Sequence, residues 1–278
     1  MTGTRTTGLA LLTTALMTAV AVPSALVMAT AGSGQSQPPA PRIAGGKPFV
    51  DTLSALDREL WAVSDGWANG PYMVNDWQAS QARFDKGLTL TLAPGIVKKH
   101  RYSSGEVQSK AKYGHGYFET TMRAAPGSGV ITGFFTYTGP PFGQPWNEID
   151  VEVLGAKPRE VLLTYFFGDD KISTAIPLDF DATAEYHTYG FDWQPGYIEW
   201  YLDGRPIHRV TGDKLPLPNL AKKLMINLWG SETLSEWSGK VEPDAMPTTA
   251  DFTCIAYSPS AADSMPCHEL RQQDNTAA

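Results

Sequence analysis

Residues 146–155 read Trp-Asn-Glu-Ile-Asp-Val-Glu-Val-Leu-Gly, a stretch in which acidic and aliphatic side chains alternate. Successive side chains of a β-strand point to opposite faces of the sheet. The stretch therefore predicts a strand with Glu148, Asp150 and Glu152 on one face. The aliphatic residues between them would lie on the other face, in a hydrophobic core.

Three carboxylates in a row on one face repel one another, which costs stability unless they serve a function or bind a cation. An exposed acidic strand face is the alternative, but Trp146 and nearby aromatic runs favour a cleft. Glycosidic cleavage needs two carboxyl groups, and a third between them can hold a proton and separate their pKa values. Calcium sites usually draw their ligands from a turning, glycine-containing loop. The extended strand therefore favours glycoside hydrolysis over cation binding.

The spacing of the outer two acids bears on the stereochemistry. Four residues at about 3.3 Å each place the Cα atoms of Glu148 and Glu152 about 13 Å apart. If each side chain reaches about 4 Å towards the other, about 5 Å remains between the carboxyl groups, close to the ~5–5.5 Å of retaining glycosidases. The spacing predicts retention of anomeric configuration.

The rest of the chain predicts an all-β fold. Leu88–Leu92 alternates with period two, and Asp203-Gly204 is a hairpin-turn signal. No amphipathic helix of ten or more residues stands out, and 26 Gly and 21 Pro punctuate the sequence. Further strands are expected at 117–123, 129–137, 148–154, 161–167, 187–193, 197–202, 206–210, 224–229 and 251–257. Many short strands separated by turns indicate a sandwich of two antiparallel sheets.

The two ends differ from this central part. Residues 1–31 contain one charge, Arg5, then an apolar stretch and a small-residue cleavage site, which predicts a secretory signal peptide. A retained membrane anchor is the alternative, but the apolar run is short for a span. Residues 32–48 are expected to form a flexible linker, 49–259 the catalytic domain, and 260–278 a polar, loosely ordered tail. The mature protein is expected to be secreted or periplasmic, without stable membrane association.

The net charge and the cysteine content limit which classes of ligand the protein is expected to bind. Loss of Arg5 with the signal would change the formal net charge from -7 to -8, which argues against sequence-independent nucleic-acid binding. Cys254 and Cys267 are the two cysteines. In an exported chain they are expected to form a disulfide, with two free thiols as the alternative. Their spacing suggests no metal site.

Several motifs together give the sequence a family resemblance. They are Asp65-Gly-Trp-Ala-Asn-Gly70, Ser104-Gly-Glu-Val107, Phe134-Phe-Thr-Tyr-Thr-Gly-Pro140, Glu148–Glu152, His187-Thr-Tyr-Gly-Phe-Asp-Trp193, Asn227-Leu-Trp229 and Glu236-Trp237. Over residues 52–259 the chain resembles glycoside hydrolase family 16, which includes the bacterial lichenases (endo-β-1,3-1,4-glucanases). The resemblance implies a concanavalin-like β-jelly roll with a substrate groove on the concave sheet. Residues 229–237 and the cysteine-bearing tail are more similar to the branch that trims bacterial exopolysaccharides.

The resemblance also implies roles for particular residues. Glu148 matches the nucleophile, Asp150 the assisting acid and Glu152 the general acid/base. The substrate-binding residues that it implies are Asn69, Glu106, Phe135, Tyr137, Trp146, Asn227, Trp229 and Trp237. The sequence alone leaves open whether Phe135 and Tyr137, or the residues between them, face the groove.

Some positions depart from the family pattern. Asn147, Gln108, Thr164 and Phe166 replace an Asp, an Arg, an Asn and a Tyr found in many relatives, which points away from plain cereal glucan. No cofactor is expected to be required. A structural calcium ion is allowed by the resemblance, although Thr253 replaces an acid near the expected site.

The function that follows is a retaining endo-β-glucanase, acting as a monomer on a β-1,3-1,4-type glucan or a bacterial exopolysaccharide. A non-catalytic carbohydrate-binding protein of the same fold is one alternative, since a fold alone does not fix function. A transglycosylase of the same family, or an enzyme that cleaves agar or carrageenan, is another.

Overall fold

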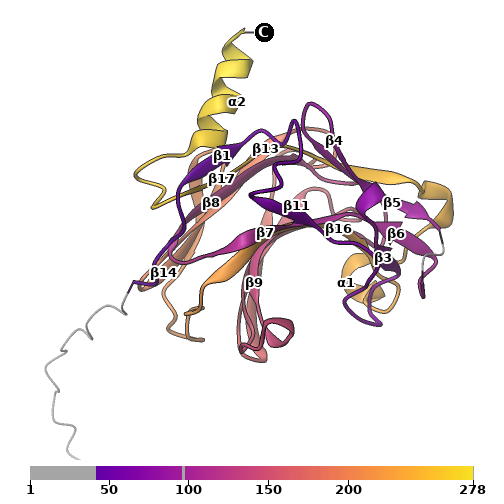
Figure 1. Cartoon of the computed structure of the whole chain (residues 1–278), viewed down its shortest axis with the longest axis horizontal. Helices are drawn as coiled ribbons and strands as arrows, with labels where there is room; N and C mark the ends of the chain where they lie inside the picture. Colours follow the sequence, from indigo (N-terminus) through magenta and orange to yellow (C-terminus); the bar gives the residue numbers. More distant parts are fainter. Residues whose placement is uncertain (1–41, 96–97, 278) are drawn as a thin grey trace, which may run out of the picture. The chain divides into compact units, whose positions relative to one another are not determined.

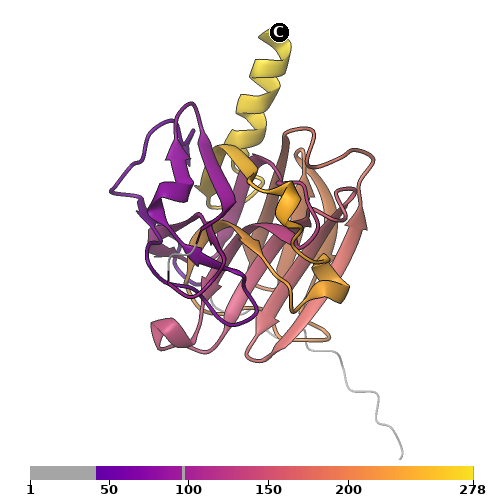
Figure 2. The ribbon, with the colours of Figure 1, turned by 90° about the vertical axis from the view of Figure 1, so that its right-hand side faces the viewer.

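Two β-sheets packed face to face make up most of the described chain, which in this computed structural model is residues 42–95 and 98–277. The predicted signal segment and the first part of the predicted linker lie outside the described residues. Arg42–Pro48 contains no helix or strand, and the first strand, β1, begins at Phe49. Figures 1 and 2 show the two sheets from two directions.

The sheet that carries the predicted acidic strand has seven strands within the described ranges. In spatial order they are β12 (Asp170–Pro177), β11 (Glu160–Phe167), β10 (Asn147–Leu154), β9 (Val130–Thr138), β16 (Lys222–Gly230), β7 (Glu106–Tyr113) and β2 (Trp61–Val63). Every neighbouring pair in this sheet is antiparallel. The predicted acidic strand, β10, therefore lies inside the sheet, with two strands on one side and four on the other.

The second sheet has ten strands in the same described ranges. Its main path is β15 (Arg205–Val210), β14 (Tyr197–Leu202), β13 (His187–Gln194), β8 (Gly116–Arg123), β17 (Thr248–Ser258), β5 (Leu88–Pro94), β6 (Tyr102–Ser104) and β3 (Asn75–Trp77). β1 (Phe49–Asp51) pairs with β17, and β4 (Ala82–Phe84) pairs with β5. The pair β3–β6 is parallel, a departure from the all-antiparallel expectation. The predicted all-β sandwich is otherwise confirmed.

The hydrophobic core lies between the sheets and takes one face of each. Ile149 and Val151 of β10 belong to it, together with Phe134 of β9 and Phe191 of β13. Trp200 of β14 donates from its indole Nε1 to the backbone oxygen of Asp150 at 3.1 Å, so the second sheet also fixes the backbone of β10. Alternation along β10 therefore leaves its acidic side chains on the face that points away from the core.

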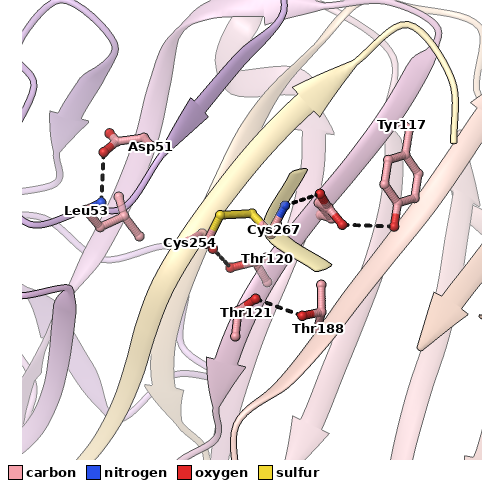
Figure 3. Close-up of a disulfide and its surroundings, with 9 residues drawn as sticks. Asp51, Leu53, Tyr117, Thr120, Thr121, Thr188, Cys254 and Cys267 are labelled. Atoms are coloured by element: carbon pink, nitrogen blue, oxygen red, sulfur yellow. Dashed lines mark hydrogen bonds between the residues drawn. A yellow bond between two sulfur atoms is a disulfide. The ribbon is translucent and has the colours of Figure 1, made fainter. Parts of the chain in front are cut away.

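The C-terminal segment differs from its prediction. Instead of a loosely ordered tail, the structure has a helix, α2 (Pro266–Ala277), which contacts β8, β13 and β17 (Figure 1). Cys254 and Cys267 form a disulfide that joins β17 to the first turn of α2 (Figure 3). The sequence analysis missed the helix because most of its residues are polar and its attachment is tertiary.

Glu119 of β8 provides a second attachment for α2. Its fully buried carboxylate accepts a hydrogen bond from the backbone N–H of Cys267 at 2.6 Å and one from the Tyr117 hydroxyl at 3.1 Å. A carboxylate at a helix N-terminus pairs with free N–H groups and with the positive end of the helix dipole. Burial raises the pKa of Glu119 to about 7, and the hydrogen bonds oppose this rise. Together with the disulfide, Glu119 holds α2 on the sheet opposite to the acidic strand.

Candidate active site

The predicted triad lies on the outer side of the seven-stranded sheet, here called the acid face. Glu148 and Glu152 are half-buried, and Asp150 between them is 5% exposed. Cross-strand partners in a sheet share a face. The acid face therefore also carries the residues paired with the three acids, namely Tyr137 and Phe166 beside Glu148, Phe135 and Thr164 beside Asp150, and Gly133 and Leu162 beside Glu152.

This register settles a question that the sequence left open. Phe135 and Tyr137 lie on the acid face, whereas Phe134 is completely buried in the core. Both residues predicted as substrate contacts on β9 are therefore next to the acids. Tyr137 is close enough that the charge of Glu148 adds to burial, and together they raise the pKa of the Tyr137 hydroxyl to about 12.

Glu148 is surrounded by aromatic rings and hydrogen-bond donors. Trp146 donates its indole N–H to the Glu148 carboxylate and stacks on Phe166, with ring centroids 5.1 Å apart. Tyr137 meets the Trp146 ring edge-on at 6.0 Å. Burial raises the pKa of Glu148 to about 8 and the Glu152 charge adds to the rise, while hydrogen bonds from Trp146 and Asp150 act against it.

Asp150 lies between the two outer acids and forms a hydrogen bond with Glu148. Burial raises its pKa well above the usual value, and the charges of Glu148 and Glu152 raise it further. The hydrogen bond between Asp150 and Glu148 raises the pKa of Asp150 and lowers that of Glu148. This hydrogen bond therefore favours the arrangement in which Asp150 carries the proton and Glu148 is the carboxylate.

Glu152 has a different environment. Burial raises its pKa to about 7, and the charge of Lys171 lowers it. No hydrogen bond to Glu152 is among the causes of this shift, in contrast to the two donors that favour ionised Glu148. The two outer acids therefore differ in their partners, since donors stabilise ionised Glu148 and none contributes to the pKa shift of Glu152.

Glu106, a predicted substrate contact on β7, is fully buried. One carboxylate oxygen accepts from the Ser64 hydroxyl at 2.7 Å, and the other accepts from the Asn227 side-chain amide at 3.3 Å. Gln108 donates to the same oxygen as Ser64 at 3.3 Å. Glu106 therefore affects the acid face indirectly, by orienting the side-chain amide of Asn227.

The remaining predicted contacts form a group at one side of the acid face. Trp229 of β16 lies 6.0 Å from Trp237 of α1 (Ser235–Ser238), centroid to centroid. Asn69 accepts a hydrogen bond from the Trp77 indole at 2.7 Å and contacts the Tyr72 hydroxyl. The structure thus gathers the predicted site residues around one face.

Two residues of this face were missed by the sequence analysis. Tyr72 is 39% exposed and packs edge-on against Trp229. Burial is the main cause that raises the pKa of its hydroxyl. The nearby charges of Glu148, Glu106 and Glu152 raise it further. Gly133 lies between Glu152 and Asn227, and a Cβ there would approach Asn227 Oδ1 to 2.7 Å. Neither has a local sequence signal, because both depend on pairing with distant segments.

The raised pKa of Glu148 predicts a stability effect. Its carboxyl ionises near 4.5 in an unfolded chain and near 8 in the folded one, so ionisation favours unfolding between these values. Protonated Glu148 contributes to the free energy of unfolding below pH 4.5, and this contribution is lost as pH rises from 4.5 to about 8. We expect Glu148→Gln to raise the melting temperature more at pH 8 than at pH 4.5 in calorimetry.

Glu160→Gln, at the exposed start of β11, is the control for removing a charge from a neighbouring strand. If the melting temperatures of Glu148→Gln and the wild type differ by the same amount at pH 4.5 and pH 8, the environment described for Glu148 is contradicted.

The residues described here do not provide an acidic cage for calcium. No group of three or more His, Cys, Asp or Glu side chains able to hold a metal occurs within the described ranges. Thr253, on β17, offers only a hydroxyl near the position where the resemblance would place an acid. Calcium ligands in proteins also include backbone carbonyl oxygens, so a structural calcium ion stays a prediction.

Comparison with known proteins identifies the family. The model of glycosyl hydrolases family 16 matches residues 69–246. A beta-glucanase of Acetivibrio thermocellus is 37% identical over 77% of this chain, a match that spans 63% of the relative's own length. A beta-glucanase of Paenibacillus polymyxa is 36% identical over 76% of this chain and 88% of its own.

Solved structures agree with this match. The crystal structure of a prokaryotic beta-1,3-1,4-glucanase (lichenase) from a mouse hindgut metagenome superposes with a TM-score of 0.74, at 32% identity, over 77% of this chain and all of that one. The predicted jelly-roll fold and the glycoside hydrolase class are thereby confirmed at the level of the family. This chain belongs to glycosyl hydrolases family 16.

Proposed function

We propose that the protein is a retaining endo-β-glucanase that works by double displacement. The observation that carries this is the acid face of β10, where Glu148, Asp150 and Glu152 lie in line. Relatives named beta-glucanase support β-glucan as the substrate class. A lectin of the same fold would gain nothing from three aligned, mutually repelling carboxylates.

In the first step, the Glu148 carboxylate attacks the anomeric carbon while Glu152 gives its proton to the departing glycosidic oxygen. A glycosyl ester forms on Glu148, and the part of the polymer beyond the cleaved bond leaves with that proton. In the second step, Glu152 takes a proton from water, and the water oxygen displaces Glu148. Each step inverts the anomeric carbon, so the product retains the original configuration.

The surrounding side chains support this division of roles. The hydrogen bonds of Trp146 and Asp150 stabilise Glu148 as the carboxylate that attack requires. Burial without a comparable donor favours protonated Glu152, the form that acts as an acid. Proton transfer from a positioned acid contributes about 10²–10⁴-fold to rate.

The direction of the polymer follows from the same arrangement. Both carboxyl groups must reach one glycosidic bond, so the chain passes between Glu148 and Glu152 and crosses β10. Aromatic side chains lie on both sides of this crossing, with Phe166 on β11 and Tyr137 and Trp229 on β9 and β16. Sugar contacts on both sides favour cleavage within a polymer rather than at its end.

The finer substrate follows from the positions that depart from the family pattern. Thr164 is buried and bonded to Ser173 at 2.9 Å, and Phe166 is stacked on Trp146. Gln108 binds Ser64, Glu106 and Lys223 instead of extending free over the face. A substrate hydroxyl that is buried without a partner costs binding free energy, so we propose a bacterial exopolysaccharide over plain cereal glucan.

A hydrolysis panel tests the proposal. Lichenan, barley glucan, laminarin, xyloglucan, agarose and a bacterial exopolysaccharide are incubated with the enzyme, and viscosity and product size are followed. We expect a rapid fall in viscosity on a β-glucan and the highest kcat/KM on a bacterial polymer. Products longer than the substrate would indicate a transglycosylase, and binding without cleavage of any polymer would indicate a carbohydrate-binding protein.

The proposal includes export. Residues 1–31, which carry the signal-peptide pattern, lie outside the described residues. Within 42–95 and 98–277, no helix is long and apolar enough to cross a membrane. N-terminal sequencing of protein recovered from the medium or periplasm tests the prediction, with a mature end near residue 32 as the expected result.

A further inference from the structure

Two lysines extend the acid face beyond the triad. Lys223 of β16 is the cross-strand partner of Tyr137, which is itself the partner of Glu148. Lys112 of β7 is the cross-strand partner of Lys223. Glu148, Tyr137, Lys223 and Lys112 thus form one row across four adjacent strands, and we call Lys112 and Lys223 the lysine pair.

Both members of the lysine pair lie close to one aromatic ring, that of Phe142. Phe142 lies in the short 3₁₀ turn η2 (Pro140–Phe142) and is half-buried. The Nζ atoms of Lys112 and Lys223 lie 5.3 Å and 5.6 Å from the centroid of its ring. The ring also contacts Tyr137, with centroids 5.9 Å apart. Two cations and a partly open ring therefore occur together on the side of the face where the polymer would pass.

The lysine pair has no carboxylate partner among the described residues. No ion pair of Lys112 or Lys223 with an acid occurs there. Lys112 donates to the Thr138 hydroxyl at 3.5 Å, and Lys223 donates to the amide oxygen of Gln108 at 3.1 Å. Burial lowers the pKa of Lys223 and the charge of Lys112 lowers it further, whereas buried Glu106 acts in the opposite direction.

These contacts leave a local excess of positive charge on a protein whose formal net charge is -7. Two ammonium groups that repel each other and lack a counter-ion are suited to bind an external anion. The Phe142 ring beside them offers a surface for the apolar face of a sugar. A carboxylate attached to that sugar could accept charge-assisted hydrogen bonds from both lysines.

We propose that Lys112, Lys223 and Phe142 form a subsite for a sugar unit that carries a carboxylate. The inference rests on the proposed function, which places the polymer across β10 and the strands beside it. Neighbouring strands are about 4.8 Å apart, so Lys223 and Lys112 stand about 10 Å and 14 Å from the strand of Glu148. The subsite thus binds a sugar unit next to or beyond the one that reacts, and the preferred substrate is an acidic β-glucan.

The test compares one glucan with and without carboxylates. Barley glucan is used as such and after oxidation of a fraction of its C6 hydroxymethyl groups to carboxylates. For each enzyme variant the ratio of kcat/KM on the oxidised glucan to that on the neutral glucan is measured at low salt. We expect Lys112→Met to lower this ratio about two- to five-fold, chiefly through KM, as for an exposed charge pair. Lys223→Met should lower it at least as much, and Lys112→Glu further.

Lys157→Met is the matched control, because Lys157 is an exposed lysine in the turn between β10 and β11 and lies outside the row. The ratio should stay at its wild-type value in this variant. High salt should reduce the difference between wild type and Lys112→Met, because screening weakens exposed charge interactions.

An unchanged ratio in both methionine variants would overturn the subsite while leaving the proposed function intact. A binding measurement separates the two ideas further. Calorimetry with the Glu148→Gln variant and an oxidised glucan fragment requires no turnover. Tighter binding of the oxidised fragment than of the neutral one, lost on adding Lys112→Met, supports the subsite, and equal binding of both fragments contradicts it.

Discussion

Glu148→Gln should lower kcat on β-glucan by about 10⁴-fold or more while the protein remains folded. An amide cannot form the glycosyl ester, and loss of a nucleophile that works with its neighbours as one unit removes most of the rate enhancement. The side chain lies on the outer face of β10, away from the core, so the fold is retained when the carboxylate is replaced by an amide. The measurement is steady-state hydrolysis of barley glucan, beside a circular dichroism spectrum and a melting curve.

A stronger form of this prediction uses a small anion. In Glu148→Ala, azide can enter the space left by the carboxylate and attack the anomeric carbon once, with Glu152 still present as the acid. The product should be an α-glycosyl azide from a β-glucan. Glu160→Gln should keep wild-type turnover, and wild-type turnover by folded Glu148→Gln would remove Glu148 from the nucleophile role.

Glu152→Gln should lower kcat/KM on natural glucan by about 10²–10⁴-fold, the range of general acid catalysis. The loss should depend on the leaving group. A natural sugar alcohol needs a proton to depart, whereas a dinitrophenolate does not. On a dinitrophenyl glucan oligosaccharide, the first step should therefore be nearly as fast as in the wild type.

The second step then becomes slow, because no base activates water. Rapid mixing of this aryl substrate with Glu152→Gln should show a burst of one dinitrophenolate per enzyme. With Glu152→Ala, added azide should accelerate turnover and yield a β-glycosyl azide. Equal losses on natural and activated substrates, with no burst, would show that Glu152 is not the acid.

The strands predicted from sequence were those with alternating side chains or with a continuous apolar and aromatic run, such as β16. Leu88–Leu92 lies within β5, and the acidic stretch lies within β10. β12 was missed because it is an edge strand with exposed and half-buried residues only. β7 was missed because its outer face carries Glu106, Gln108 and lysines, so that its buried positions do not form an apolar pattern.

The catalytic residues could be predicted because they lie on one strand, where spacing alone decides which side chains share a face. The supporting residues could not. Tyr72 reaches the acids from a loop, and Gly133 matters because Asn227 of another strand occupies the space beside it. The buried state of Glu106 depends on Ser64 and Asn227, which are 42 and 121 residues away in the chain.

In the proposed mechanism Glu148 and Glu152 act on opposite sides of one bond in two successive displacements. Proton NMR during the first minutes of β-glucan hydrolysis tests it most directly, because it reports the configuration of the new reducing end before mutarotation. Two displacements predict that the β-anomer appears first and that the α-anomer grows in slowly. If the α-anomer appears first, a single displacement by water has occurred, and the assignment of Glu148 as nucleophile is wrong.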